Sequence, residues 1–228
     1  MKQLKLKEDL YWIGAVDHDL REFDVVLNTP WGTTYNSYLV IGSEKKAIID
    51  TVKHTKIDEY LEQLTTIVDI TEIDYLIVNH AEPDHTGSIK KLLELHPGLI
   101  IVGSNRALQN VRDITNMTFQ SIGVKDGSTL SLGNKTFEFF NAIMLHWPDT
   151  IYSYLVEDKA LFTCDSFGAH YALDVPLQSN ITDKAEYDKA FLYYFEHIFG
   201  PFKSYYLDAI AKIENLEIDL VCVGHGPI

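Results

Sequence analysis

The sequence contains little cysteine: two residues, Cys164 and Cys222, among 228. Both lie in apolar stretches, where a thiol packs as a small hydrophobic side chain. Two cysteines cannot build the disulfide framework that stabilises small secreted domains. We therefore expect a protein of a reducing compartment, the cytoplasm.

Long apolar runs and basic residues are also scarce. No run approaches the roughly 20 apolar residues that cross a bilayer, and the alternating charged and apolar residues at 1–8 do not resemble a signal peptide. Lys and Arg number 19 against 33 Asp and Glu, which gives a net charge of −14. Nucleic acid and membrane surfaces are therefore poor partners, and we expect neither.

The rest of the composition is that of a globular protein, with 46% hydrophobic and 23% charged residues. The length fits one sizeable α/β domain or two small ones, and no low-complexity segment or linker interrupts the chain. We expect residues 1–228 to form a single domain.

Apolar runs and alternation predict strands at 10–13, 35–41, 47–50, 75–78, 100–102, 136–140, 151–156, 160–164 and 220–223. Helical spacing predicts helices at 55–64, 88–96, 105–113, 183–199 and from 201 to about 215. Thr55, with Asp58 three residues later, is expected to cap the first of them. Two strand-rich stretches flanked by helices indicate an α/β fold, with two sheets face to face and helices outside.

The most informative stretch is Asn79-His80-Ala81-Glu82-Pro83-Asp84-His85-Thr86-Gly87-Ser88. It places two His and two carboxylates within six residues, directly after the apolar run 75–78. A loop held by a rigid strand can keep metal ligands in a fixed geometry. Without a cation, four such polar groups would have to stay solvated or repel one another. The pattern therefore predicts a metal site rather than a polar turn.

Three more candidate ligands follow strand-like runs. His146 comes after 142–145, Asp165 after 161–164, and His225 after 220–224. Since strand ends of packed sheets can converge on one rim, these residues join the four of the loop. Seven ligands are too many for one tetrahedral zinc, but they fit two metals about 3.5–4 Å apart with a bridging carboxylate. The mixture of nitrogen and oxygen ligands is compatible with iron, manganese or zinc.

With these residues in view, the chain resembles the metallo-β-lactamase-like domain of flavodiiron proteins over nearly its whole length. The motif His80-x-Glu82-x-Asp84-His85, followed by His146, Asp165 and His225, matches the signature of that family. Hydrolases of the same superfamily carry His-x-His-x-Asp-His, so Glu82 marks the di-iron branch. Further segments look like the family: 32–36, 147–149, 164–168 and 224–227.

The resemblance implies a metallo-β-lactamase-like αββα sandwich with two mixed sheets and two iron ions per chain. His80, Glu82 and His146 would hold one iron, Asp84, His85 and His225 the other, and Asp165 would bridge them. The family reduces O2 to water or NO to N2O at this centre. We therefore expect a di-iron protein that binds and reduces O2 or NO; a dizinc hydrolase is the alternative that Glu82 disfavours.

Family members usually continue into a flavodoxin-like domain that carries FMN, and no flavin-type phosphate loop occurs in these 228 residues. The chain is therefore either a fragment of such a protein or a member of the family without the flavodoxin-like domain. We expect no FMN in these residues, and electrons from a separate flavoprotein or rubredoxin-like donor. The other interpretation is an oxygen or redox sensor that signals to a partner protein without fast turnover. Family members pair head to tail, so a homodimer is expected over a monomer.

Two residues outside the ligand set are candidates for roles beside the centre. His170 follows Asp165 by five residues and is placed in the pocket, with packing as the alternative. Tyr194 lies on the helix predicted at 183–199, and could pack there or approach the site. Asp50 ends a strand as Asp165 does and is expected to fix a loop. His54 and His96 are expected to be structural. His18 could approach the site or lie in a surface turn, and His197, on the same predicted helix as Tyr194, could pass near the site or serve packing.

Overall fold

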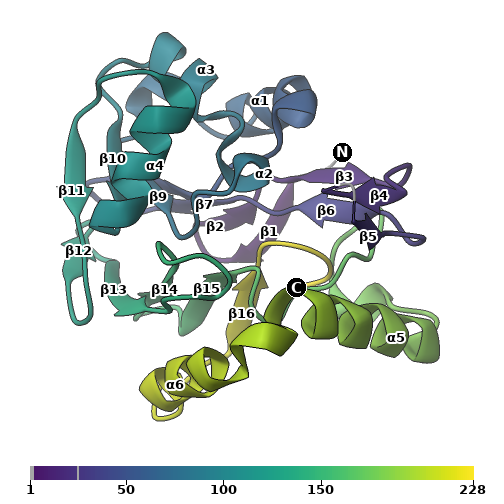
Figure 1. Ribbon diagram of the computed structural model, residues 1–228. Coiled ribbons are helices and arrows are strands. Elements are labelled where there is room, and N and C mark those ends of the chain that lie inside the picture. Colours follow the sequence, from purple (N-terminus) through teal and green to yellow (C-terminus); the bar gives the residue numbers. More distant parts are fainter. Residues whose placement is uncertain (1–2, 25) are drawn as a thin grey trace.

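Two β-sheets form the centre of the computed structural model, which describes residues 3–24 and 26–228 (Figure 1). The larger sheet has seven strands in the order β1-β2-β7-β8-β9-β10-β11. Antiparallel pairing on the N-terminal side gives way to parallel pairing from β8 to β11. The strands are β1 (Leu4–Lys7), β2 (Leu10–Trp12), β7 (Tyr38–Ile41), β8 (Lys46–Ile49), β9 (Tyr75–Val78), β10 (Ile100–Gly103) and β11 (Ser121–Gly123).

The second sheet has five strands in the order β12-β13-β14-β15-β16. All its pairs are antiparallel except the last, because β16 returns from a distant part of the chain to lie parallel to β15. The strands are β12 (Thr129–Ser131), β13 (Thr136–Asn141), β14 (Ile151–Leu155), β15 (Ala160–Cys164) and β16 (Leu220–Val223). Both sheets are therefore mixed, as the sequence predicts.

A layer of buried hydrophobic side chains lies between the two sheets. It takes Trp12 and Tyr38 from the first sheet and Phe137 and Phe162 from the second, each at most 2% exposed. Burying an aromatic side chain of this size stabilises the fold by about 2–3 kcal/mol. Packing of the two sheets against each other places strand ends of both sheets along one edge of the sandwich. The polar loops leave the strands at this edge.

Helices cover the two outer faces, which completes an αββα sandwich (Figure 1). Those of the first half pack on the larger sheet, and α6 packs on the smaller one. The α-helices of the described residues are α1 (Ile57–Thr65), α2 (Pro83–Thr86), α3 (Ile89–Leu95), α4 (Asn105–Thr115), α5 (Lys184–Tyr194) and α6 (Lys203–Ile213). Shorter turns are η1 (His54–Lys56), η2 (Ile70–Glu72), η3 (Gln178–Asn180), the π-helical η4 (Phe195–Phe199) and η5 (Gly200–Phe202).

The helix predicted at 183–199 is shorter and changes its winding. It is α-helical to Tyr194, and Phe195–Phe199 then form a π turn. Pro201, which has no backbone N–H, lies in the following 3-10 turn and ends the helix. Single π turns inside helices often accompany functional sites, and this one brings the rings of Tyr194 and Phe199 to 6.1 Å.

Two other expectations need correction. Thr55 does not cap α1, because a 3-10 turn precedes it and the Lys56 amide donates to the Lys53 carbonyl. The strand predicted at 35–41 is divided into β6 (Thr33–Tyr35) and β7. β6 pairs with β3 (Ala15–Asp17) in a separate ribbon, and another ribbon joins β4 (Glu22–Phe23) to β5 (Leu27–Asn28).

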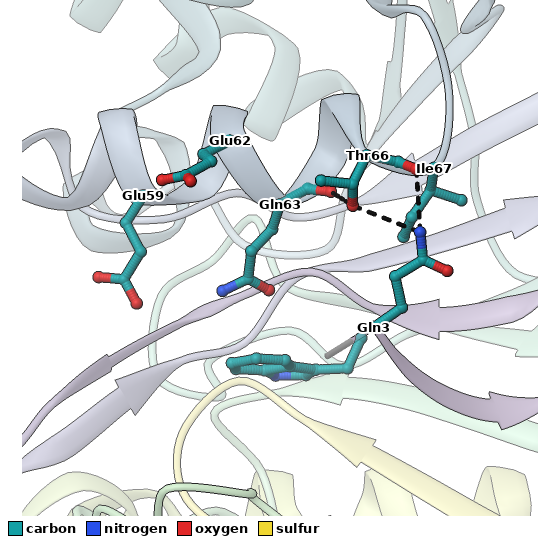
Figure 2. A pocket seen from close by; sticks show the side chains of 7 residues that line it. Gln3, Glu59, Glu62, Gln63, Thr66 and Ile67 are labelled. Carbon is teal, nitrogen blue, oxygen red and sulfur yellow. Dashed lines mark hydrogen bonds between the residues drawn. The ribbon is translucent and has the colours of Figure 1, made fainter. Parts of the chain in front are cut away.

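The N-terminal segment is tied to α1 at the edge of the larger sheet. Gln3 donates its side-chain amide to the Thr66 carbonyl at 2.9 Å. A small cleft of about 190 Å³ lies beside this contact, with Glu59 and Glu62 on its wall (Figure 2). It shares no residue with the predicted metal site. Within residues 3–24 and 26–228, every helix is too short or too polar to cross a lipid bilayer.

Candidate metal centre

The His-rich loop leaves the end of β9 and enters α2 almost at once. Glu82 stands at the N-cap and Pro83 at the first helical position, where its missing N–H costs no hydrogen bond. One helical turn therefore carries Asp84 and His85 inward, and both are buried. The loop is held from behind by Asp50, whose Oδ1 accepts the Asn79 amide at 2.8 Å. Asp50 thus fixes the loop, as predicted.

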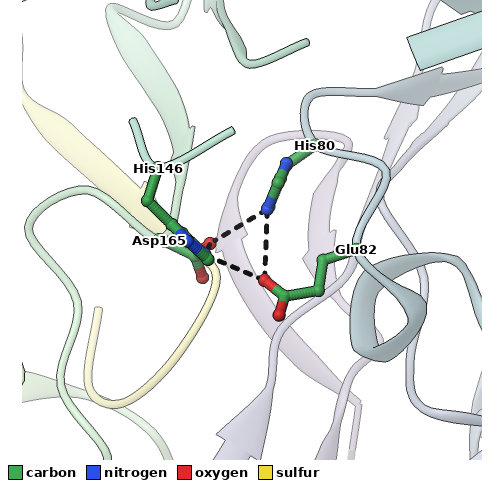
Figure 3. A group of neighbouring side chains, drawn as sticks. All are labelled: His80, Glu82, His146 and Asp165. Atoms are coloured by element: carbon green, nitrogen blue, oxygen red, sulfur yellow. Dashed lines mark hydrogen bonds and ion pairs between the residues drawn. The ribbon is translucent and has the colours of Figure 1, made fainter. Parts of the chain in front are cut away.

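Four of the predicted ligands form a first group, His80, Glu82, His146 and Asp165 (Figure 3). The Oε2 atom of Glu82 lies 3.2 Å from His80 Nε2 and 2.9 Å from His146 Nε2. Both imidazole nitrogens lie 3.6 Å from Asp165 Oδ2. The ligand atoms of the group all fall within 4.8 Å of one another, which is the spacing of donors around one cation.

The other three predicted ligands form a second group beside the first: Asp84, His85 and His225. Asp84 Oδ2 lies 3.0 Å from His225 Nε2 and 3.5 Å from His85 Nε2. These distances are short, yet among residues 3–24 and 26–228 neither oxygen of Asp84 has a hydrogen-bond partner. The nitrogen and oxygen atoms therefore point at a common centre rather than at each other.

Asp165 faces both groups with different oxygens. Its Oδ2 is directed to His80 and His146, and its Oδ1 lies 3.0 Å from His85 Nε2 and 3.4 Å from His225 Nε2. The chain adopts a left-handed conformation at Cys164, with φ 49°, immediately before this residue. Such a turn is uncommon for a residue with a Cβ, and it directs the Asp165 side chain across the rim between the groups.

The seven candidate ligands are better explained by a site with two cations than by a site without a cation. Asp84 Oδ1, Asp84 Oδ2 and Asp165 Oδ2 are buried and lack a hydrogen-bond partner among the described residues. A buried carboxylate without a hydrogen bond or a paired charge is expensive. Two cations between the groups would satisfy these oxygens, and imidazole with carboxylate suits iron, manganese or zinc.

The electrostatic field of the site favours positive charge. Burial by itself lowers the pKa of His80, His85 and His146, but the surrounding carboxylates outweigh it and raise each pKa to about 10. Burial also opposes the ionisation of Asp165, yet the imidazoles around it hold its pKa well below the usual range. A metal ion would replace the protons that these imidazoles otherwise hold.

Partners behind the ring fix the direction of two imidazoles. His225 donates from Nδ1 to the Thr34 carbonyl at 2.6 Å, so its Nε2 faces the centre. Behind His80, Asp149 Oδ2 lies 3.4 Å from Nδ1 and also accepts the Ala81 amide at 2.7 Å. Partners of this kind set the tautomer and orientation of metal-binding histidines.

Gly224 allows the last strand to approach the centre. A Cβ on this residue would lie 3.0 Å from Cε1 of His85 and 2.9 Å from the Cys164 carbonyl carbon. Any side chain here would therefore displace either a candidate ligand or the turn before Asp165.

Tyr194 and His170 both lie beside the centre. The Tyr194 hydroxyl donates to Asp165 Oδ1 at 3.0 Å. The His170 ring lies 4.8 Å from the rings of Tyr194 and His225, and its Nδ1 is 2.9 Å from Thr33 Oγ1. Its Nε2 is buried and has no hydrogen-bond partner in the described part of the chain. Burial lowers the pKa of His170, so the ring is neutral.

The remaining histidines lie outside this cluster. His18 is exposed and pairs with Asp174 at 2.8 Å, and His54 is exposed in η1. His96 contacts the Ile73 carbonyl at 3.1 Å, and His197 contacts the Tyr193 carbonyl at 2.8 Å. The placements of His54 and His96 agree with the structural roles expected from the sequence, and His18 and His197 lie outside the site.

Residue type alone does not identify the partners behind the rings. Asp149 carries no signal of its own, because it lies 69 residues from His80 and belongs to a loop between strands. The backbone carbonyl of Thr34 leaves no trace in residue type at all. The only sequence signal for either was the likeness of segments 147–149 and 32–36 to the flavodiiron family.

Comparison with known proteins agrees with this geometry. The model of a family described as ODP family beta lactamase matches residues 33–226. The flavo-diiron protein FprA2 of Clostridium acetobutylicum is 39% identical over 230 residues, which span all of this chain and 57% of that protein. The chain thus spans little more than half the length of this curated relative.

Two solved structures share the fold closely. The flavodiiron protein from Giardia intestinalis has a TM-score of 0.94 and 29% identity, covering 100% of this chain and 55% of that one. The rubredoxin oxygen:oxidoreductase from Desulfovibrio gigas has a TM-score of 0.94 and 31% identity, covering 99% of this chain and 57% of that one. The resemblance to flavodiiron proteins and the metallo-β-lactamase-like fold predicted from the sequence are confirmed.

Proposed function

We propose that this chain, which belongs to the ODP family of beta-lactamase-like proteins, is a non-haem di-iron protein. It would bind and reduce O2 or NO. The names of its relatives support this, since they include a flavo-diiron protein and a rubredoxin oxygen:oxidoreductase. We further propose that O2 is the preferred substrate and NO the second one.

The observation that carries the proposal is the position of Asp165 between two groups of ligands. In the proposed site, His80, Glu82 and His146 would hold one iron, and Asp84, His85 and His225 would hold the other. Asp165 would serve both irons, because its Oδ2 faces the first group and its Oδ1 the second. Ferrous ions held there would supply electrons for the reduction of O2 or NO.

The protein side chains control access and protons around that centre. His146 has the most exposed side chain of the seven, at 18% against 10% or less for the others. A diatomic molecule or an electron donor would therefore approach past His146. Tyr194 donates to Asp165 and restrains the bridge, and neutral His170 leaves Nε2 free to accept or donate a hydrogen bond near His225.

Electrons are proposed to come from a protein outside residues 1–228, a flavoprotein or a rubredoxin-like donor. We propose that these residues form one domain without bound FMN, and that two copies associate as a homodimer. The free thiols of Cys164 and Cys222 support a cytoplasmic location, where thiols stay reduced.

Rapid mixing of diferrous protein with O2 tests this function. Without a donor, the protein should take up O2 once, change its absorption spectrum and stop, because two ferrous ions yield two electrons and full reduction of O2 takes four. Addition of a reduced rubredoxin or flavoprotein should restore continuous O2 uptake. Oxygen uptake that a donor protein never sustains would instead support the sensor interpretation, with the long-lived product as the signal.

A dizinc hydrolase would behave differently in the same assay. Glu82 distinguishes the di-iron protein from the dizinc hydrolase, because a carboxylate occupies the position at which hydrolases of this fold carry a second His. Protein loaded with zinc should show no hydrolase activity on a chromogenic β-lactam or thioester. Fast hydrolysis by the zinc form, together with no reaction of the iron form with O2, would overturn the proposed function.

A further inference from the structure

An open apolar cleft lies between the segment that follows β5 and helix α5, which are neighbours in Figure 1. It has a volume of about 200 Å³ and is lined by Asn28, Pro30, Trp31, Lys189 and Tyr193. None of these residues belongs to the two groups of candidate metal ligands. An occupant of the cleft would therefore be a separate ligand, and not the diatomic molecule of the metal centre.

One wall of the cleft is Trp31, which a tight turn holds in place. The Gly32 amide donates to the Thr29 carbonyl at 3.0 Å, so Pro30 and Trp31 are the central residues of the turn. Proline favours the first central position because its φ is already set, and glycine favours the last position, where Gly32 has a φ of 68°. The Tyr171 ring lies 6.4 Å from that of Trp31, which is half-buried. The indole is thus supported from inside and presents its remaining surface to the cleft.

The other aromatic wall is Tyr193, which is held at both ends. Its hydroxyl accepts the Asn28 amide at 3.3 Å, and the His197 ring stacks against it with the centroids 4.0 Å apart. Two rings that are fixed before a ligand arrives lose little side-chain entropy when it binds. A flat aromatic ligand complements such walls, because it gains offset or edge-on ring contacts in addition to apolar burial.

Lys189 is the only charged residue among those that line the cleft. Its side chain is exposed, and in residues 3–24 and 26–228 no carboxylate forms an ion pair with it. The acid that precedes it, Asp188, pairs with Lys184 at 3.0 Å instead. The chain as a whole carries a net charge of −14. An unpaired ammonium group at an apolar cleft of this acidic protein therefore favours a ligand with one negative charge close to its ring.

We infer that the cleft binds a small planar aromatic anion, a compound of one or two fused rings that carries a carboxylate. The ring lies against Trp31 and Tyr193, and the carboxylate points to the Lys189 ammonium group. The volume of the cleft is below the roughly 300–1,000 Å³ of sites for drug-sized ligands, which limits the ligand to this size. The inference goes beyond the proposed function and does not depend on the metal that the centre holds.

Titration with indoleacetate, followed by nuclear magnetic resonance, tests the inference on the full chain. Zinc is supplied so that the sample stays diamagnetic, and indoleacetamide serves as the neutral probe of the same shape. The three tryptophans each give an indole N–H signal. The Trp31 signal should shift, whereas Trp12 is buried with its Nε1 bonded to Asn36 and Trp147 lies beside His80, so their signals should stay. Indoleacetate should bind about threefold more tightly than indoleacetamide, the scale of one exposed ion pair.

Two substitutions separate the contribution of the charge from that of the ring. Lys189→Gln should lower the affinity for indoleacetate to that for indoleacetamide. Lys184→Gln, which alters an exposed lysine at the start of the same helix, is the matched control and should keep the threefold preference. Trp31→Leu should weaken the binding of both probes by about tenfold, measured by saturation transfer from the protein to the probe.

Three results would overturn the inference. They are a Trp31 signal that does not move, indole signals that all move alike, and equal affinity of the natural chain for the two probes. An affinity that falls as the protein concentration rises would show that a second copy of the chain covers the cleft, and this also would contradict a small-molecule site. Failure of the protein to bind iron or take up O2 would refute the proposed function and leave these measurements unaffected.

Discussion

Asp149 lies directly behind His80, with its Oδ2 atom 3.4 Å from His80 Nδ1. The same oxygen accepts the Ala81 amide at 2.7 Å, and Asp149 is fully buried. The Asp149 carboxylate therefore fixes both the His80 ring and the backbone of Ala81. Glu82 directly follows Ala81 in the chain. Asp149 therefore orients two candidate ligands of the first group, the His80 ring directly and Glu82 through the backbone.

Asp149→Asn should weaken metal binding at the first group by about 10–100-fold, the usual cost of losing a partner behind a metal-binding histidine. The amide is nearly the same size but lacks the charge that favours Nδ1–H on His80. The second group has no contact with Asp149 and should retain its metal. Titration of the metal-free protein with ferrous ion under anaerobic conditions measures both affinities.

Asp188→Asn is the matched control, because Asp188 is exposed and forms a surface ion pair with Lys184. Its two affinities should equal those of the natural chain. Unchanged binding at the first group in Asp149→Asn would show that His80 is held by other contacts.

Asp165→Ala should lower the affinity for both metals together, and by more than the loss of an outer partner does. His225→Ala should empty mainly the second group, because its Nε2 faces Asp84 and not Glu82. Elemental analysis after dialysis against a weak chelator separates these cases. His96→Ala, which alters a histidine outside the centre, serves as the control; two tight sites in Asp165→Ala would remove that residue from the bridge.

Asp50→Asn should flatten the pH dependence of stability in the metal-free protein. Burial raises the pKa of Asp50 to about 6, above its value of roughly 3.9 in an unfolded chain. The folded state then binds the proton more tightly, so stability is greatest below pH 4 and falls as pH rises through 6. The loss amounts to about 3 kcal/mol, and the amide of Asn can still accept the Asn79 N–H.

Urea unfolding at several values between pH 4 and pH 7 measures this effect. The difference in unfolding free energy between Asp50→Asn and the natural chain should grow with pH. A difference that stays constant would mean that Asp50 is ionised throughout this range, stabilised by the imidazoles nearby.

Much of the fold and all seven candidate ligands could be predicted from the sequence, for a physical reason. Buried strands are apolar runs of four or five residues, and a ligand that follows such a run is placed at the rim by the strand itself. The His-rich loop after β9 and Asp165 after β15 are examples. Residue type and position along the chain carry this information together.

Features that depend on contacts between distant segments could not be predicted in this way. The π turn at Phe195–Phe199 has the composition of an ordinary helix, and its winding follows from the packing of Tyr194 and Phe199 near the centre. The division between β6 and β7 arises because Asn36 turns away and donates its side-chain amide to the Val223 and Gly226 carbonyls. Such bonds span almost the whole chain and leave no local periodicity.

The number of ferrous ions bound per chain tests the central claim most directly. Anaerobic titration of the metal-free protein, followed by gel filtration and elemental analysis, should give two irons per chain in the natural sequence. Both should be lost together in Asp165→Ala. One tightly bound metal per chain, or binding of zinc with no affinity for iron, would contradict a bridged di-iron centre.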